Sequence, residues 1–515
     1  MTTRRAIQLA LLALFIYLLV QTKWTLPAIF PVDTFLKIDS LLSLQAALAS
    51  RSWVNSAYYG ILMILLAVFL GRFFCSWMCP LGTCLELGDD LFYGRKKKRV
   101  WKNSDRRLRG VKYGILVLIV VVALFGQNLA YLFDPISWIT RIFTYALWPV
   151  FTAVGNLAVD ILRPVFEALG WMNLARADIA QPTFGAFGIV SIIFIAILLW
   201  LGRFQRRFWC RSLCPLGALY AIFSRFSLSC RRVSDLCDDN GRCGCECETG
   251  AIPNNYREYD PAECIQCMRC VDVCHVKAVK FIPTFSKQRR VFSFDLTRRQ
   301  LVGWLGAGAL GAVWLAYNPM RILLSDKALR PPGAIPENDF LATCVRCGQC
   351  VKSCPTNCLE PSFLETGIAG LMTPITLMRL GPCDQNCNAC GQVCPTDAIR
   401  PIDLYEKTYA KIGNAVIDKA RCIVWEQGKI CLVCDENCPY GSIYWEENEK
   451  GERRPFVDAN RCNGCGQCEH ACPIEGSSAI RVFPAGQIRL KEGSYIQAAR
   501  ERGLILKSKD KGYYE

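Results

Sequence analysis

The sequence predicts an α-helical membrane module of about five spans, joined to small α+β domains that fold around clustered cysteines. Two observations lead to this fold class. Hydrophobic residues make up 52% of the 515 residues and gather in long apolar runs, which are typical of membrane helices. The chain also holds 31 cysteines, many in C-x2-C spacings, and in a long chain such spacings indicate metal ligands rather than a disulfide framework.

Five apolar runs are candidate membrane helices. They cover residues 6–22, about 56–71, about 111–127, about 184–202 and 301–317. The first run follows two arginines and resembles a signal peptide, but it lacks a convincing small-residue cleavage site. We therefore expect it to remain as the first membrane helix.

Basic residues set the expected orientation. The basic stretches at 95–99, 105–109, 203–211 and 289–299 fall on one side if four spans precede residue 203, and the positive-inside rule makes that side the cytoplasm. Residues 318–515 hold equal numbers of basic and acidic residues, so the net charge of +16 belongs to the part with the spans and does not indicate nucleic acid. We expect a multi-pass protein of the cytoplasmic (inner) membrane with its C-terminal domain on the periplasmic side.

The fifth apolar run lies in the segment LTRRQLVGWLGAGALGAVWLAY, within residues 296–320. A basic pair before a mildly apolar, Gly/Ala-rich stretch looks like a twin-arginine export signal. The alternative is an ordinary span with a basic flank. Both interpretations place the following domain outside the cytoplasm.

Cysteine runs in the C-terminal part predict four iron–sulfur clusters. They follow the spacing C-x2-C-x2-C-x3-C-P or lengthen its first gap, and in paired runs the fourth cysteine binds the neighbouring cluster. This exchange predicts that Cys354 binds the cluster of the Cys383 run and that Cys394 binds the cluster of the Cys344 run. Cys438 and Cys472 should be exchanged between the other two runs in the same way. Zinc is the alternative metal, but repeated groups of four cysteines that end in C-P disfavour it. The runs are Cys344, Cys347, Cys350 and Cys354; Cys383, Cys387, Cys390 and Cys394; Cys422, Cys431, Cys434 and Cys438; and Cys462, Cys465, Cys468 and Cys472.

A third pair of runs, between the fourth and fifth apolar runs, predicts two more clusters. One run is regular except that His275 replaces the usual proline; it consists of Cys264, Cys267, Cys270 and Cys274. The other run has Asn240 where a ligand is expected and holds Cys237, Cys243 and Cys247. Either Cys230 or Cys245 must supply the missing thiolate, and the spacing does not choose between them.

Four further cysteines form an internal repeat, GRFFCSWMCPLG at 71–82 and FWCRSLCPLG at 208–217. A pseudo-twofold arrangement would bring their thiols together, enough for another cluster or for a copper or zinc ion. The alternative is redox-active or structural thiols without metal. The four residues are Cys75, Cys79, Cys210 and Cys214. Cys84 and Cys358 have no partner by spacing, and we expect them to be small packing residues.

Absent motifs narrow the function class. The sequence contains no C-x-x-C-H, and its two histidines, His275 and His470, lie outside the apolar runs. No G-x-G-x-x-G follows a predicted strand. Attached c-type haem, bis-histidine b-type haem and a dinucleotide site are therefore unsupported, and iron–sulfur centres are the expected electron carriers.

These motifs carry a family resemblance. Residues 1–290 resemble the NapH-type membrane subunit of the periplasmic nitrate reductase quinol-dehydrogenase system, and also parts of the nitrous-oxide reductase accessory protein and of oxidase-assembly ferredoxins. Residues 296–480 resemble the exported NapG-type ferredoxin, so the chain looks like a fusion of the two. The resemblance implies oxidation of menaquinol or ubiquinol, with the membrane quinone pool as substrate and a periplasmic multihaem cytochrome or reductase as acceptor.

We therefore expect a four-span membrane module with two C-x3-C-P motifs (1–229), a cytoplasmic two-cluster ferredoxin-like domain (230–290), the fifth span (296–320), an exported four-cluster ferredoxin domain (335–480) and a basic tail (481–515). The expected function is quinol-linked electron transfer through about six [4Fe–4S] clusters. The alternative is an assembly or metal-handling factor that uses the C-x3-C-P thiols. Asp39 and Asp134 are candidate proton acceptors for a quinone site.

The expected topology can be tested with reporter fusions. An alkaline phosphatase domain fused after Glu515 should be active, because the reporter works only outside the cytoplasm and the last domain is expected there. The same reporter fused after Phe281 should be inactive. Activity in the second fusion alone would show that the orientation is reversed.

Overall fold

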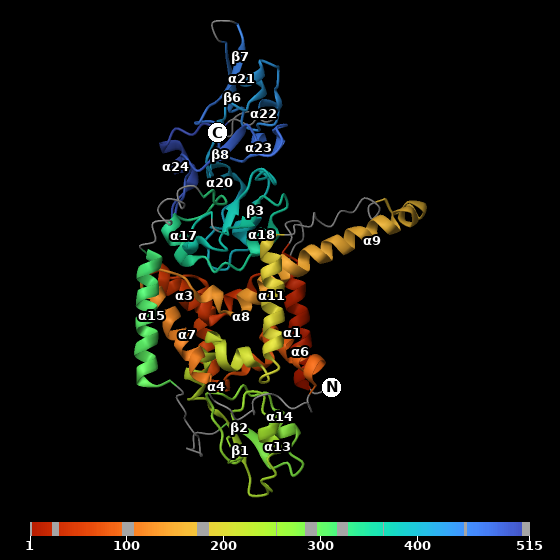
Figure 1. Cartoon of the computed structure of the whole chain (residues 1–515), viewed down its shortest axis with the longest axis vertical. Coiled ribbons are helices and arrows are strands. Elements are labelled where there is room, and N and C mark those ends of the chain that lie inside the picture. The colour runs from red at the N-terminus through yellow and green to blue at the C-terminus, as the bar shows by residue number, and fades with distance from the viewer. Residues whose placement is uncertain are drawn as a thin grey trace. The chain divides into compact units, whose positions relative to one another are not determined.

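The computed structural model describes residues 3–22, 30–94, 108–172, 185–253, 255–283, 296–316, 328–363, 365–447 and 451–506. The chain divides into two compact units. One unit comprises residues 1–21 and 28–314, and the other comprises residues 22–27 and 315–515. The first unit is a helical bundle with a small domain that contains β1 and β2, whereas the second consists of short strands, short helices and loops (Figure 1).

Helices make up the bundle of the first unit. In chain order they are α1 (Thr3–Val20), α2 (Thr34–Lys37), α3 (Ser40–Ser50), α4 (Ser56–Leu70), α5 (Phe73–Trp77), α6 (Pro80–Gly88), η1 (Asp89–Tyr93), α7 (Arg109–Leu124), η2 (Ala130–Leu132), α8 (Pro135–Ile142), η3 (Phe143–Leu147), α9 (Trp148–Ala168), α11 (Ala186–Leu201), η4 (Trp209–Leu213), α12 (Pro215–Ser224) and α15 (Arg298–Ala316).

The five predicted spans correspond to α1, α4, α7, α11 and α15. Among the described residues, however, only Thr3–Val20 and Pro135–Ala168 are both long enough and apolar enough to cross a membrane, so five spans are not established. The helix of residues 135–168 was not predicted. Its second half carries Asp160, Arg163 and Glu167, and these charges interrupt the apolar run.

Helix α9 extends away from the rest of the bundle (Figure 1). Its apolar side chains are exposed, with Phe151 at 56%, Leu157 at 59% and Ile161 at 66%. Exposed apolar patches of this extent on a folded protein indicate contact with lipid or with another protein.

The two halves of the bundle repeat the same contacts. Helix α1 packs against α6 and α7 packs against α12, while α3 packs against α4 and α8 packs against α11. Each half also contains one R-x2-C-x3-C-P-L-G stretch, which begins at Arg72 or at Arg207. The bundle therefore has approximate twofold symmetry, with α9 as an addition to the second half.

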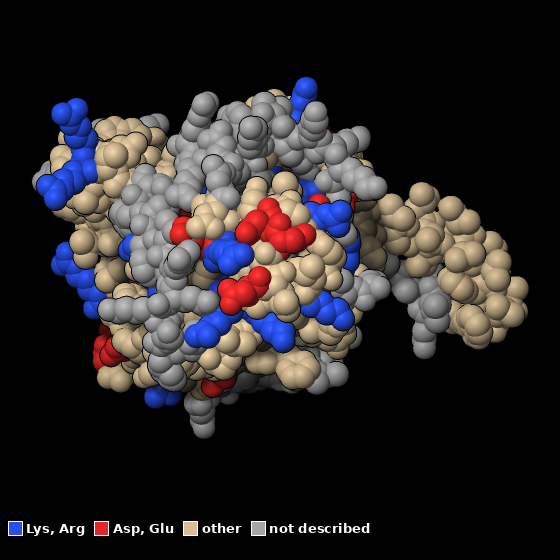
Figure 2. All heavy atoms as spheres, turned by 90° about the horizontal axis from the view of Figure 1, so that it is seen from below, with Lys and Arg blue, Asp and Glu red and all other residues tan. Residues whose placement is uncertain are grey.

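The small domain of the first unit is built on one antiparallel pair, β1 (Ser229–Val233) and β2 (Val279–Pro283). The short helices α13 (Arg242–Cys245) and α14 (Arg269–Asp272) lie between these strands in the sequence and contact each other. Basic and acidic side chains are interspersed on the face of the molecule seen in Figure 2.

Two groups of buried charges join the small domain to the bundle. In the first, Glu86 on α6 accepts hydrogen bonds from Arg4 and Arg269, both at 2.6 Å, and pairs with Arg207. Glu248 of the small domain pairs with the guanidinium groups of Arg207 and Arg269 at 2.8 and 2.7 Å. Three arginines and two glutamates from distant parts of the sequence therefore compensate one another.

The second group centres on Glu263 of the small domain. Both of its carboxylate oxygens lie 2.6 Å from the ammonium nitrogen of Lys112, and Arg72 lies 3.3 Å away. Burial alone would raise the pKa of Glu263, but Lys112 and Arg72 lower it to about 2. The carboxylate therefore stays charged at neutral pH and holds the domain against α7 and the Arg72 loop.

The second unit contains short elements in the following order: α17 (Glu337–Thr343), α18 (Gln349–Ser353), β3 (Leu359–Pro361), η5 (Ile368–Gly370), β4 (Pro374–Thr376), α19 (Ala389–Gln392), α20 (Leu404–Tyr409), β5 (Asn414–Ile417), α21 (Ile423–Gln427), α22 (Val433–Glu436), β6 (Ile443–Glu447), β7 (Arg453–Val457), α23 (Gln467–Ala471), β8 (Ile480–Phe483) and α24 (Tyr495–Glu501). Its strands form antiparallel pairs, β3 with β4, β5 with β8 and β6 with β7.

The segment that follows residue 480 belongs to the core of the second unit and is not a tail up to residue 506. Tyr495 and Ala499 on α24 are fully buried, and Leu504 and Leu506 pack into the same cluster as Ile488. The prediction of a basic tail counted charges and missed the apolar residues spaced between them.

Glu86→Gln tests the charged connection. The substitution leaves three buried arginines with one carboxylate fewer, so we expect a loss of about 3–5 kcal/mol in the free energy of unfolding. Thermal unfolding in detergent, followed by helix signal, measures the effect. The control is Asp160→Asn, which removes an exposed pair with Arg163 on α9 and should change little. Equal unfolding temperatures for the two variants would contradict the role of the network.

Candidate iron–sulfur sites

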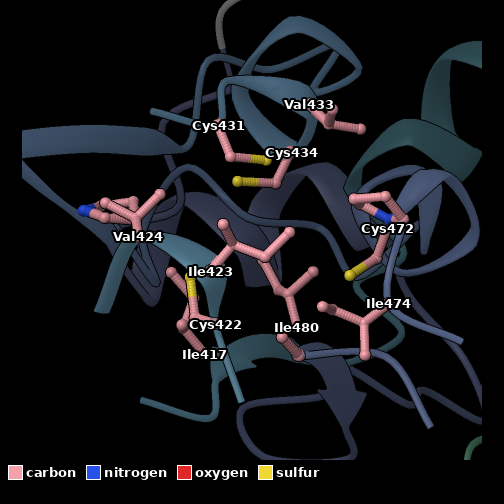
Figure 3. Close-up of a pocket in the computed structure, with 13 residues that line it drawn as sticks. Ile417, Cys422, Ile423, Val424, Cys431, Val433, Cys434, Cys472, Ile474 and Ile480 are labelled. Atoms are coloured by element: carbon pink, nitrogen blue, oxygen red, sulfur yellow. The ribbon is translucent and has the colours of Figure 1, made fainter. Parts of the chain in front are cut away.

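The sulfurs of the second unit gather in four groups. We define site 4 as Cys422, Cys431, Cys434 and Cys472, which line one pocket. The first three come from one run and the fourth from another, as the exchange of fourth cysteines requires. The remaining wall is apolar and includes Ile417, Ile423, Ile474 and Ile480 (Figure 3). A dry pocket with thiolate donors suits an iron–sulfur cluster.

Site 2 consists of Cys354, Cys383, Cys387 and Cys390, which line a second pocket. Cys354 again comes from the preceding run. The same wall includes Cys358, whose Sγ lies 3.6 Å from the Sγ of Cys354 and which is 3% exposed. Cys358 is thus buried, as expected of a packing residue, but it also contacts a predicted ligand, which spacing alone did not indicate.

Sites 1 and 3 show the reciprocal exchange. Site 1 consists of Cys344, Cys347, Cys350 and Cys394, because the thiols of Cys347 and Cys350 interact electrostatically with that of Cys394. Site 3 consists of Cys438, Cys462, Cys465 and Cys468, whose thiols interact in the same way and share one core. Each of the four groups therefore joins two runs.

The loops fold around the sulfurs because several backbone positions adopt a left-handed conformation. Gly464 and Gly466 flank Cys465 with φ of 80° and 77°. A side chain at position 466 would also collide with Met378, since a Cβ there would lie 2.6 Å from the Met378 side chain. Only glycine combines this conformation with this close approach.

Burial makes these thiols depend on a bound metal for their charge. It raises the pKa of Cys347 and of Cys465 to about 12, because a thiolate there is poorly solvated. A metal ligand must be a thiolate, so the cluster itself has to supply the compensating positive charge.

The four sites lie in series. Cys350 of site 1 interacts with Cys390 of site 2. The backbone N–H of Cys383 in site 2 donates to the carbonyl of Cys465 in site 3 at 2.8 Å, and Cys468 of site 3 interacts with Cys434 of site 4. The order in space is therefore 1–2–3–4, which differs from the order of the runs in the sequence.

The small domain of the first unit holds site 5. Cys247, Cys264, Cys267 and Cys270 line one pocket, so the irregular run supplies its last cysteine to the regular run. The regular run in turn ends at Cys274, next to His275.

Site 6 would use Cys237, Cys243 and Cys274. The thiols of Cys237 and Cys243 interact, and the side-chain amide of Asn240 lies 3.2 Å from Nδ1 of His275. Cys230 is fully buried and its thiol donates to the carbonyl of Ser227, whereas Cys245 is exposed beside Cys243. Cys243 also packs against the core that contains Cys230, so both Cys230 and Cys245 stay candidates for the fourth ligand.

The structure brings the two C-x3-C-P motifs together in what we call the four-thiol site, and its members are buried. The thiols of Cys79 and Cys214 each interact with those of Cys75 and Cys210. Each motif also holds the other: Arg207 donates to the carbonyl of Cys75 at 2.9 Å, and Arg72 donates to the carbonyl of Cys210 at 3.4 Å.

The C-P-L-G sequence explains how each motif ends. Cys79 and Cys214 are the N-caps of α6 and α12, and each is followed by proline in the first helical turn. The sulfur accepts the backbone N–H of Gly82 at 3.4 Å and of Gly217 at 3.3 Å. Sulfur, helix start and glycine are therefore fixed together in both halves.

The four-thiol site adjoins site 5. Trp77, which lies between Cys75 and Cys79, donates its indole N–H to the carbonyl of Gln266 at 3.1 Å. Gln266 lies between Cys264 and Cys267 of site 5. One hydrogen bond therefore connects the two cysteine loops directly.

Among the described residues, no three His, Cys, Asp or Glu side chains are gathered closely enough to hold one metal ion.

Comparison with known families finds iron–sulfur domains over several of these cysteine runs. Models described as 4Fe-4S binding domains match residues 60–99 with 185–232, and residues 261–277 with 341–357. A model described as a 4Fe-4S dicluster domain matches residues 429–475. The first of these matches includes both C-x3-C-P motifs.

Individual relatives identify the family. The methylamine utilization ferredoxin-type protein MauM of Methylorubrum extorquens is 39% identical over 201 residues, which is 36% of this chain and 89% of that protein. The ferredoxin-type protein NapG of Escherichia coli is 37% identical over 210 residues, which is 38% of this chain and 85% of that protein. The chain belongs to the NapG/MauM family of ferredoxin-type proteins. It is an electron-transfer protein with several [4Fe–4S] clusters.

A longer match extends beyond the family segment. The putative electron transport protein YccM of Escherichia coli is 28% identical over 325 residues, which is 59% of this chain and 80% of that protein. No solved structure matches the chain.

Cys358→Ala tests the contact between Cys358 and site 2. The Cys358 thiol hydrogen-bonds to Cys354 and is the main reason why the pKa of Cys354 is lowered to about 6. Hydrogen bonds to cluster sulfurs raise the reduction potential, so removing one should lower the potential of site 2 by about 40 mV, the equivalent of roughly 1 kcal/mol. Redox titration followed by electron paramagnetic resonance measures the shift.

Cys84→Ala serves as the matched control, because Cys84 lies on α6 in the other unit. Cys358→Ser keeps a donor and should shift the potential less than Cys358→Ala. An unchanged potential in Cys358→Ala, with full iron content, would show that Cys358 only fills space.

Proposed function

We propose that the chain oxidises membrane quinol and passes the electrons through its [4Fe–4S] clusters to a periplasmic cytochrome or reductase. The observation that carries this proposal is the series of sites 1 to 4, in which each site interacts with the next. A structural role would need no such order, whereas electron transfer requires neighbouring centres. In this proposal the NapG/MauM-type part is joined to a NapH-like membrane part.

Exposed apolar surface supports a membrane position for the first unit. Tyr58 and Phe69 on α4 are 64% and 53% exposed, Ile189 on α11 is 64% exposed, and Leu310 on α15 is 74% exposed. Together with α9, these side chains would meet lipid. The cytoplasmic membrane, with the second unit on the periplasmic side, remains the predicted location.

The four-thiol site is the proposed entry point for electrons. It lies between the apolar bundle and site 5, so a cluster there would connect the lipid phase to the small domain. Burial of its thiols argues against the alternative role of a metal-delivery factor, because a delivered ion must reach a partner. Cys75, Cys79, Cys210 and Cys214 would be its ligands.

Site 4 is the proposed exit within the second unit, because it stands at one end of the series. Ile430, between Cys422 and Cys431 in the sequence, is 91% exposed, and Leu432 is 44% exposed. Apolar side chains beside a terminal cluster would let an acceptor approach closely.

Iron content and its loss on substitution test the cluster assignments. Anaerobically purified protein should contain on the order of 24 iron atoms for six clusters of four, and about 28 if the four-thiol site holds a seventh. Cys472→Ser should remove about four iron atoms, and Cys79→Ser should do the same if the four-thiol site holds the seventh cluster, whereas the control Cys84→Ser should remove none. The cluster signal lost in Cys472→Ser should be the one lost in Cys431→Ser, because both residues belong to site 4. It should differ from the signal lost in Cys465→Ser, which belongs to site 3.

Electron entry can then be measured directly. The purified protein should be reduced by a short-chain quinol, and Cys79→Ser should lose this reduction while dithionite still reduces the other clusters. Abundant zinc with fewer than about 12 iron atoms would contradict the six-cluster assignment. Unchanged quinol oxidation in Cys79→Ser would contradict the entry point.

A further inference from the structure

Two buried aspartates occupy equivalent positions in the two halves of the bundle. Asp39 is the N-cap of α3 and Asp134 is the N-cap of α8, and both are fully buried. The Asp39 carboxylate accepts the backbone N–H of Leu41 at 2.8 Å, and that of Asp134 accepts the backbone N–H of Ser137 at 2.7 Å. Each carboxylate therefore caps its helix with one oxygen.

Each carboxyl group has a second oxygen that has no bonding partner among the described residues. Oδ2 of Asp39 and Oδ1 of Asp134 are buried and receive no N–H or O–H within the described part of the chain. The charge of each carboxyl group acts on the other, so the two groups are close in space. Two acceptors can bond only through a proton, and two carboxylates in contact cannot both stay charged. A pair that shares one proton and carries one negative charge avoids this repulsion.

The groups around the pair connect it to the four-thiol site. Arg141 on α8 interacts with Asp134, and Tyr220 on α12 interacts with Asp39. The Tyr220 hydroxyl lies 3.0 Å from the hydroxyl of Ser40, the neighbour of Asp39. The ring of Tyr220 lies 5.6 Å from that of Phe74, the neighbour of Cys75. One tyrosine thus spans the distance between the carboxyl pair and the thiols.

We propose that the Asp39–Asp134 pair accepts the protons released when a quinol is oxidised in the membrane module. This inference rests on the proposed function. Oxidation of one quinol to quinone breaks two O–H bonds and releases two electrons and two protons. The electrons pass one at a time to iron–sulfur centres. The singly charged pair takes the first proton, becomes neutral, transfers it to water and then takes the second.

Asparagine substitutions separate this role from helix capping. In Asp39→Asn or Asp134→Asn the amide oxygen can still cap the helix, and its N–H can donate to the remaining carboxylate. The bundle should therefore fold with full iron content, but the pair has lost its exchangeable proton. The matched control is Asp33→Asn, because Asp33 is also buried at a helix start but pairs with Lys37 at 2.8 Å.

Two measurements on the full-length protein test the pair. Infrared spectroscopy should show a protonated carboxyl band in the wild type that disappears in Asp39→Asn and in Asp134→Asn and remains in Asp33→Asn. Reduction of the clusters by a short-chain quinol should slow by about 100-fold or more in both pair variants, as expected for loss of a proton acceptor. Reduction by dithionite, which releases no quinol protons, should keep its wild-type rate.

The outcomes distinguish this inference from the proposed function. If the band behaves as expected but quinol reduces both pair variants at the wild-type rate, the pair is structural and the inference is wrong. If the band is absent from the wild type, the shared proton does not exist. If quinol fails to reduce the wild type although dithionite does, the proposed function itself fails, and with it the role of the pair.

Discussion

The exchange of one cysteine between neighbouring runs is the constraint on which the second unit depends. Each site takes three sulfurs from one loop and the fourth from another, so a bound cluster joins segments that are far apart in the sequence. The strands are short pairs and the helices are mostly one turn long, too small to bury a large apolar core. The ligand bonds replace that burial, and folding of this unit is therefore coupled to cluster binding. Because Cys350 adjoins Cys390, and Cys468 adjoins Cys434, the same loops that hold the clusters also place them in contact.

In the first unit, buried ion pairs rather than shared cysteines connect segments that are far apart in the sequence. Glu86 and Glu248 compensate arginines that come from α1, from the second C-x3-C-P motif and from site 5. A buried ion pair contributes little net stability, because the free energy of desolvation offsets the attraction between the charges. Removal of one partner is nevertheless strongly destabilising, because it leaves a buried charge uncompensated. Such a network mainly fixes one arrangement. It holds the loop of Cys75 and Cys79 against the loop of Cys264 and Cys267, where electron transfer needs a fixed separation.

The structure brings together the cysteines that their spacing had grouped, whereas it adds a long helix that the sequence did not predict. Spacing is a local property, so the runs and the exchange of Cys354, Cys394, Cys438 and Cys472 could be read directly, and the repeat predicted that Cys75 and Cys210 would meet. The helix of residues 135–168 was not predicted because charged residues at one end interrupt its apolar sequence. The burial of Tyr495 and Ala499 in the core was not predicted, because basic residues lie between the apolar residues of this segment. The contact of Cys358 with Cys354 was not predicted from spacing, since it arises in the turn that leads from Cys354 into β3.

The approximate twofold symmetry of the bundle explains why the acids and the thiols occur together. In each half, one aspartate starts the helix that packs against the apolar helix leading to the cysteine motif. Residues near the symmetry axis necessarily meet their own counterparts, so Asp39 meets Asp134 as Cys75 meets Cys210. Like groups in contact are unfavourable when they carry the same charge, and each pair needs a partner of opposite charge: a proton between the carboxylates, and a metal centre among the thiolates. In the proposed mechanism, this repeat places a proton site and an electron site within reach of a single residue, Tyr220.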